Sequence, residues 1–323
     1  MTSCEKELKL ITGQDLSLSE PYTSDKSLKN SLNYLLSNCK TLLKKNNYNY
    51  LQKFCLNEKG NIFKSNEEAN KVLEKYFILD DQNFSDSIGL MTGYYEPEIN
   101  GYSYQKKGSY PIYKNPTTIS KKYLLNKSRS EINKGALRNM NLEIAWLENE
   151  VETFFLQIQG SGRIKLEDGN TIKVKYDGSN NKKYTSIGKV LIDKGELKKN
   201  KVNMFTIKSW LYKNKKRAKK IMERNQRYIF FKKYEGDIKG AANTKLIPNF
   251  SVAVDPKHTN NGALMIVSFV NNPQKKFLVM AHDNGAAIKG KNRIDLFTGY
   301  GKKAESKAAK LKEKILIKRL FPK

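Results

Sequence analysis

Residues 281–297 read AHDNGAAIKGKNRIDLF, which places a glycine-rich loop between two apolar segments. The run Phe277–Ala281 leads into Asp283, and Asp295 borders the apolar pair that follows the loop. A third aspartate, Asp255, ends the apolar run at 251–254. Because a loop on a rigid strand can present a carboxylate in a fixed position, these aspartates are the first candidates for a catalytic site. Aspartate beside Gly or Pro is also common in turns, so spacing alone leaves a structural role open.

Short strand-like runs lie on both sides of this stretch and are separated by Gly and Asn. The expected strands are Thr153–Gln159, Thr171–Tyr176, Tyr228–Lys232, Ser251–Asp255, Ala263–Val270 and Phe277–Ala281. Apolar residues at helical spacing predict helices at 26–46, 66–77, 186–194, 204–224 and 302–314. The pattern indicates a mainly β protein of the α+β class with helices at both ends.

The charge balance is strongly basic, with 60 Lys and Arg against 32 Asp and Glu and a net charge of +28. Only eight of the basic residues are Arg. Specific phosphate or base recognition favours the planar guanidinium, so the excess of Lys favours weak, non-specific attraction to anionic surfaces. A nucleic-acid-binding protein stays a rival interpretation. No apolar run approaches the roughly 18 residues that a membrane helix needs.

The cysteines and histidines do not form a metal motif. Cys4, Cys39 and Cys55 contain no CxxC pair and lie far in sequence from His258 and His282, so we expect no metal and no cofactor. Cys39 falls on the apolar face of a predicted helix and is either a reduced core residue or the partner of Cys55 in a disulfide of an oxidising compartment. The sequence Met-Thr-Ser before Cys4 is similar to the end of a lipoprotein signal.

Other common catalytic motifs are absent from the sequence. No GxSxG elbow occurs, which argues against a hydrolase of that kind. Gly160-Ser161-Gly162 lacks the third glycine of a dinucleotide fingerprint and the Lys of a P-loop.

A series of ordered motifs runs from residue 89 to residue 323. They are MTGYYEP at 91–97, YPIY at 110–113, FFLQIQGSG at 154–162, YTSIGK at 184–189, LIDKGE at 191–196, YIFF at 228–231, and the block from Asp283 to Gly290 with Asp295. Together they resemble the MltA family of membrane-bound lytic murein transglycosylases. The resemblance does not extend to the first 88 residues, which have little motif support.

The resemblance implies two domains. A double-psi β-barrel domain would comprise residues 1–110, with a helical part at 1–88, and residues 236–323. A second, β-rich domain would be inserted at 111–235, with a glycan-binding groove between the two.

The resemblance also implies a set of site residues. Asp295 matches the family's catalytic acid, and Asp283 and Asp255 match its companion aspartates. The expected substrate-binding residues are Tyr94, Tyr95, Gln157, Gln159, Gly160, Ser161, Gly162, Tyr184, Ser186, Gly285 and Lys289. For Tyr94 and Tyr95, stacking on sugar rings and burial in the core stay open alternatives.

The implied activity is that of a carbon–oxygen lyase. It would cleave the β-1,4 bond between N-acetylmuramic acid and N-acetylglucosamine without water and leave a 1,6-anhydro end. The expected partner is the peptidoglycan glycan strand, with no specific nucleic acid, and the chain is expected to be a monomer in the periplasm, anchored to the outer membrane through a lipid on Cys4. The alternative is a non-catalytic peptidoglycan-binding or scaffold protein of the same fold.

This chemistry sets a physical requirement on Asp295. To act as an acid near neutral pH, its pKa must rise from about 3.9 toward about 6. Lys289, Lys291 and Arg293 are close in sequence, and a cation within about 4–6 Å would lower that pKa. These cations must therefore point away, or a nearby carboxylate must outweigh them. We expect Asp283 or Asp255 to lie within direct or water-bridged reach of Asp295, with Lys289 and Arg293 directed elsewhere.

Overall fold

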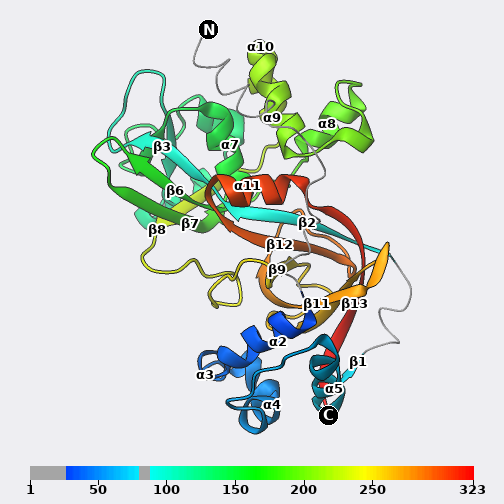
Figure 1. Cartoon of the computed structure of the whole chain (residues 1–323). Helices are drawn as coiled ribbons and strands as arrows, with labels where there is room; N and C mark the ends of the chain where they lie inside the picture. The colour runs from blue at the N-terminus through cyan, green and yellow to red at the C-terminus, as the bar shows by residue number, and fades with distance from the viewer. Residues whose placement is uncertain (1–26, 80–87) are drawn as a thin grey trace. The chain divides into compact units, whose positions relative to one another are not determined.

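The computed structural model describes residues 27–79 and 88–323 (Figure 1). These residues form two compact units. The barrel unit contains the described residues up to Tyr94 together with 237–299 and 310–323. The insert unit contains residues 95–236 and 300–309. Cys4 lies outside the described residues.

The barrel unit is built on a ring of six strands. In ring order they are β13 (Lys312–Pro322), β10 (Leu264–Phe269), β11 (Asn272–Asn284), β9 (Ser251–Val254), β12 (Arg293–Tyr300) and β2 (Gly89–Glu96). Pairing of β13 with β2 closes the ring, and β1 (Phe77–Leu79) adds to β13 from outside. The neighbours β9 and β11 run parallel, whereas β9 and β12 run antiparallel. Alternate apolar side chains such as Val252, Val267 and Leu296 fill the core of the ring.

Short helices cover one side of the barrel. They are α2 (Leu28–Ser37), α3 (Cys39–Leu42), η1 (Asn46–Leu51), α4 (Gln52–Asn57) and α5 (Asn66–Tyr76). Ser27 caps α2, and Ser65 with Glu68 forms a capping box on α5. The apolar face of α2 packs beside β11 and buries Leu28, Leu32 and Leu35 in one core cluster with Leu278 and Met280 (Figure 1).

A disulfide joins Cys39 in α3 to Cys55 in α4. Of the two alternatives for Cys39, the disulfide is therefore the one present in the structure. The single helix predicted over 26–46 is wrong, because α2 ends at Ser37 and Asn38 caps it.

The insert unit has its own six-stranded sheet. Its order is β4 (Tyr110–Tyr113), β5 (Glu143–Leu147), β3 (Glu98–Tyr102), β6 (Ser161–Leu166), β7 (Thr171–Ser179) and β8 (Ile229–Lys233). Its helices are α6 (Arg129–Asn133), α7 (Glu150–Gln159), α8 (Ile187–Asp193), α9 (Met204–Lys213), α10 (Lys215–Met222) and α11 (Gly301–Lys310). Short 3₁₀ turns lie at Pro116–Ile119, Lys122–Asn126 and Lys199–Lys201.

The prediction of a strand at Thr153–Gln159 is wrong, because these residues form the end of helix α7. The Asn149 side chain accepts hydrogen bonds from the N–H groups of Val151 and Glu152, and Gly160 ends the helix with φ +80°. The aromatic and β-branched residues favoured a strand locally, but both caps and burial on several sides stabilise a helix.

Two further helices differ in extent from the prediction. The helix expected over 204–224 is divided into α9 and α10 at Asn214. The helix expected over 302–314 ends at Lys310, and strand β13 begins at Lys312.

The predicted class, mainly β within α+β, is confirmed, whereas the double-psi connectivity and the boundaries at 110 and 236 stay predictions. Within residues 27–79 and 88–323, no helix has both the length and the apolar character needed to cross a membrane.

Candidate active site

Two of the three predicted aspartates stand in register on the barrel. Asp283 on β11 and Asp295 on β12 both pair with Ala253 on β9, which lies between those strands. In-register residues of neighbouring strands project to the same face, and each strand spacing is about 4.8 Å. The small side chain of Ala253 therefore separates two carboxyl groups on one face of the barrel.

Asp295 has the environment of a carboxyl group that stays protonated to unusually high pH. Burial raises its pKa to about 6, and the charge of Asp283 adds to the rise. The Thr92 hydroxyl on β2 donates a hydrogen bond of 2.5 Å to Asp295 Oδ1 and, with Arg293, opposes the rise in pKa. The side chain remains partly exposed. The direction of this shift is the one that an acid working near neutral pH requires, whereas its catalytic role stays a prediction.

Arg293 lies close to Asp295 but directs its N–H groups elsewhere. Its Nη1 donates to the carbonyl oxygens of Leu90 and Ile294 at 3.2 and 3.1 Å, and its Nη2 donates to Thr92 Oγ1 at 2.7 Å. Among the described residues, no ion pair joins Arg293 to Asp295. Thr92 thus stands between the guanidinium and the carboxyl group, accepting from one and donating to the other.

Asp283 is held by three hydrogen bonds. Its Oδ1 accepts from the N–H groups of Ala241 and Asn284 at 3.0 and 2.9 Å, and its Oδ2 accepts from the Tyr94 hydroxyl at 3.0 Å. Burial raises the pKa of Asp283, and these donors oppose the rise. Burial and the nearby carboxylates hold the pKa of Tyr94 well above its usual range, so Tyr94 stays a donor.

Asp255 has a different environment from the other two aspartates. It follows β9, is buried, and accepts hydrogen bonds from the N–H groups of Gly290 and Lys257 at 2.9 and 3.2 Å. These bonds, led by that from Gly290, hold its pKa below its usual range. Asp255 therefore ties the loop after β11 to the end of β9 as an ionised group.

The loop between β11 and β12 contains two further predicted residues. Gly285 packs closely against Ile288, since a Cβ at this position would lie 2.6 Å from Ile288 Cγ1. Lys289 is exposed, and its charge helps to lower the pKa of Asp255.

The predicted substrate-binding residues of the insert unit are mostly engaged with the protein itself. The prediction that Gln157 binds substrate is not supported, because this side chain is buried on α7 and does not line a surface. Gln159, partly exposed, accepts a hydrogen bond from the N–H of Tyr95 at 3.1 Å. Gly160 ends α7, whereas Ser161 and Gly162 are buried at the start of β6.

The prediction that Tyr95 binds substrate is likewise not supported, because its ring is buried with Ala304 and Ala308 in a core cluster. Core packing is thus the alternative that the structure favours for Tyr95. Tyr184 is partly exposed, and Ser186 caps α8 by accepting from the N–H of Lys189 at 3.3 Å.

Thr92 and Ala241 contact the aspartates but were not predicted as site residues. Thr92 is the second residue of the MTGYYEP motif and alternates with Tyr94 along β2, so the period of a strand was a signal for it. Ala241 contributes only its backbone N–H, for which the sequence gives no signal.

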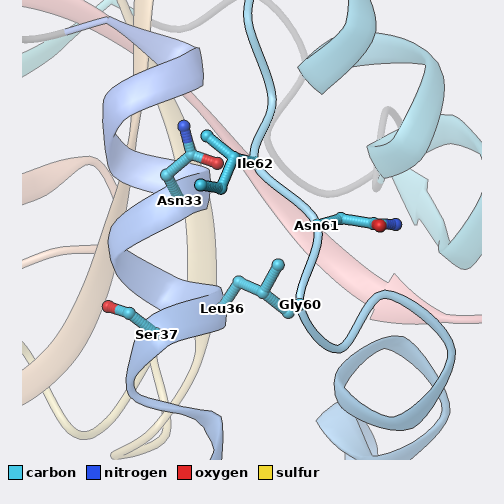
Figure 2. A pocket seen from close by; sticks show the side chains of 6 residues that line it. All are labelled: Asn33, Leu36, Ser37, Gly60, Asn61 and Ile62. Carbon is cyan, nitrogen blue, oxygen red and sulfur yellow. The ribbon is translucent and has the colours of Figure 1, made fainter.

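A hollow elsewhere on the barrel unit does not involve the aspartates. Asn33, Leu36 and Ser37 of α2 line it together with residues 60–62, as Figure 2 shows. In the part of the chain that the structure describes, no three His, Cys, Asp or Glu side chains are grouped so as to hold a metal ion.

Two family descriptions match the chain: the MltA specific insert domain at residues 90–232 and the 3D domain at residues 250–320. The membrane-bound lytic murein transglycosylase A of Vibrio cholerae is 33% identical over 238 residues, which are 69% of this chain and 62% of that protein. This chain thus spans less than two thirds of the length of that relative.

Solved structures are similar over most of the chain. The lytic transglycosylase LtgG of Burkholderia pseudomallei is 32% identical, with a TM-score of 0.60, and the alignment covers 95% of this chain and 93% of that one. Escherichia coli MltA with bound chitohexaose is 25% identical, with a TM-score of 0.75 and coverage of 94% and 97%. The chain therefore belongs to the MltA family.

Proposed function

We propose that this protein is a peptidoglycan lytic transglycosylase that cleaves the bond between N-acetylmuramic acid and N-acetylglucosamine and leaves 1,6-anhydro ends. The observation that carries the proposal is the placement of Asp295 at a partly exposed strand position in register with Asp283. Burial there raises the pKa of Asp295 to about 6, which supports the proposal. The names of the relatives and the chitohexaose bound to the Escherichia coli protein support the same class of substrate.

In the proposed reaction, one carboxyl group transfers a proton twice. Protonated Asp295 gives its proton to the glycosidic oxygen as the bond to C1 of the muramic acid breaks. The C6 hydroxyl of the same sugar then attacks C1, and the Asp295 carboxylate takes the hydroxyl proton. Water is neither consumed nor released, and Asp295 is again protonated. This differs from hydrolysis by two carboxylates, in which water adds to C1.

The hydrogen bonds around Asp295 suit this double role. Thr92 occupies Oδ1, so the proton to be transferred resides on Oδ2. Burial is the main cause that raises the pKa of Asp295, and the charge of Asp283, which Tyr94 holds, adds to it. Asp255 orders the loop from 285 to 290. Several of the residues predicted to bind substrate keep partly or fully exposed side chains, and for these we retain that role: Tyr94, Gln159, Tyr184, Ser186 and Lys289.

The proposed location is the periplasm, with attachment to the outer membrane through a lipid on Cys4 and a monomeric state. The Cys39–Cys55 disulfide supports an oxidising compartment. We retain the division into a barrel domain at 1–110 and 236–323 and an inserted domain at 111–235 as part of this proposal.

Digestion of purified sacculi tests the activity. The parent protein should release muropeptides with anhydro ends, which mass spectrometry distinguishes from reducing ends because the latter are heavier by one water. Asp295→Asn should lower the rate by about 10²-fold or more. Asp193→Asn, at an exposed position on α8, is the matched control and should retain full activity.

Two outcomes would contradict the proposal. Unchanged release by Asp295→Asn would remove Asp295 from the mechanism. Binding of sacculi by a parent protein that releases no product would instead support the non-catalytic scaffold.

A further inference from the structure

The site side of β11 is covered by a tight hairpin at residues 239–245. Lys239 and Lys245 pair across its base, and the N–H of Gly240 donates to the carbonyl of Thr244 at 3.0 Å. Asn243 sits in the turn with φ +52°. This hairpin provides the Ala241 N–H that binds Asp283 Oδ1.

The hairpin lies directly against β11. The N–H of Ala242 donates to the carbonyl of His282 at 3.0 Å. A Cβ on Gly240 would lie 2.3 Å from that same oxygen and 3.0 Å from Asp283 Cβ, so only glycine permits this approach. The position of Asp283 therefore depends on where the hairpin is held.

Two residues of the helical segment near residue 50 hold the hairpin from its other side. Lys45 Nζ donates to the carbonyl of Asn243 and, at 3.0 Å, to Thr244 Oγ1. The Tyr48 hydroxyl lies 2.9 Å from Thr244 Oγ1, which itself donates to the carbonyl of Ala242 at 3.2 Å. A hydroxyl has one proton and two acceptor positions. When the Thr244 hydroxyl accepts from Lys45 and Tyr48 and donates to Ala242, all of its hydrogen-bonding positions are therefore occupied.

The hydrogen bonds among Tyr48, Thr244 and the hairpin are buried, so water does not compete for them. Tyr48 is fully buried, Thr244 is 6% exposed, and the Tyr48 ring stands edge-on to His282 with centroids 6.1 Å apart. His282 is buried and accepts or donates at Nδ1 with Ser251 Oγ. Ser251 Oγ also accepts a hydrogen bond of 2.8 Å from the N–H of Ile247, so it joins His282 to the segment before β9.

We propose that Lys45 and Tyr48 are positioning residues for the carboxyl pair: they hold the 239–245 hairpin on β11 and so keep the Ala241 N–H on Asp283. This inference rests on the proposed function only through the influence of Asp283 on Asp295. It assigns a role to the helical segment that has no motif support in the sequence.

The charges around the hairpin give the direction of the effect. The side of the hairpin away from Asp283 carries Lys45, Lys239 and the ion pair of Lys245 with Asp237. His282 lies between this side and the site, and burial together with Lys45 lowers its pKa to about 3. On the site side are Asp283, Asp295 and Tyr94. Loss of the Ala241 bond would raise the pKa of Asp283 and weaken its charge, which lowers the pKa of Asp295.

The test compares Lys45→Met, Tyr48→Phe and the double variant with Lys44→Met, an exposed neighbour. Both substitutions keep the apolar part of the side chain, and a thermal melt by circular dichroism verifies folding. For sacculus digestion we expect kcat to fall about threefold or more, with KM unchanged and the basic limb of the pH profile moved to lower pH. In an Asp283→Asn background, Lys45→Met and Tyr48→Phe should not shift the basic limb of the pH profile any further.

A second readout does not require activity. Titration of ¹³C-labelled aspartate carboxyls by NMR should give a lower pKa for Asp295 in folded Tyr48→Phe than in the parent and in Lys44→Met. An unchanged Asp295 titration and an unchanged pH profile in folded variants would overturn the proposal. An inactive parent protein would instead contradict the proposed function, and the NMR titration would still decide the positioning role.

Discussion

At the scale of single residues, the raised pKa of Asp295 lowers the free energy of unfolding near neutral pH. Its pKa is 3.8 in an unfolded chain and about 6 in the folded protein. The folded state therefore binds more protons between these pH values, and stability falls as the pH rises through that window. The shift corresponds to at most about 3 kcal/mol at pH 7, reduced by the partial exposure of the side chain.

Asp295→Asn should therefore be more stable than the parent protein at pH 7.5 and equally stable below about pH 4. Asparagine can still accept the hydrogen bond from Thr92, so packing changes little. Urea denaturation at both pH values measures this difference in the free energy of unfolding. A variant that is no more stable at pH 7.5 would show that the folded pKa of Asp295 is not raised.

Thr92 separates Arg293 from Asp295, which gives a second prediction at this scale. Thr92→Val removes the strongest group that lowers the pKa of Asp295, so the basic limb of the pH profile should move up by about one unit. Thr92→Ser keeps the hydroxyl and should retain the parent profile. A downward shift in Thr92→Val would mean that Arg293 turns from the Leu90 and Ile294 carbonyls onto Asp295.

At the scale of elements, the Cys39–Cys55 disulfide links two short helices that cannot persist alone. The bridge closes a loop with a sequence separation of 16, which stabilises a fold by about 3 kcal/mol. Cys39→Ser with Cys55→Ser should lower the free energy of unfolding by roughly that amount.

A reductant such as dithiothreitol should lower the melting temperature of the parent protein and leave that of the double variant unchanged. Equal melting temperatures of the oxidised parent and the double variant would contradict a stabilising bridge.

The elements also show how far sequence patterns extend. Asp283 and Asp295 were predicted from motif and from the strands beside them, because strand runs and glycine-rich loops are local features. Helix α7 was missed, since Phe154 and Phe155 favour a strand locally and only the caps at Asn149 and Gly160 indicated a helix.

Contacts between distant segments were beyond local patterns. Thr92 and Asp295 are 203 residues apart, and Lys45 and Asn243 are 198 apart. Such pairs form because β2 lies beside β12 in the sheet order and because Lys45 and Tyr48 contact the hairpin. Neither event leaves a periodicity in the sequence.

At the scale of the whole molecule, the net charge of +28 should govern how the protein reaches an anionic polymer. Exposed charges are screened over a Debye length of about 8 Å at 0.15 M salt, so added salt weakens the attraction of the Lys side chains to an anionic surface. We expect the amount bound to sacculi to fall steadily as NaCl rises. Asp295→Asn should bind sacculi with the same salt dependence as the parent protein. Binding whose amount does not change with NaCl concentration would contradict this role of the net charge.

The closed strand ring has a consequence for the spacing of the two carboxyl groups. Ala253 has a hydrogen-bonded neighbour on both sides, so β9 cannot fray from an open edge. Separating Asp283 from Asp295 requires breaking the pairing of β9 with β11 or with β12, and amide exchange at the centre of β9 should therefore be slow. The acid and its charged neighbour thus keep their separation for the lifetime of the native state.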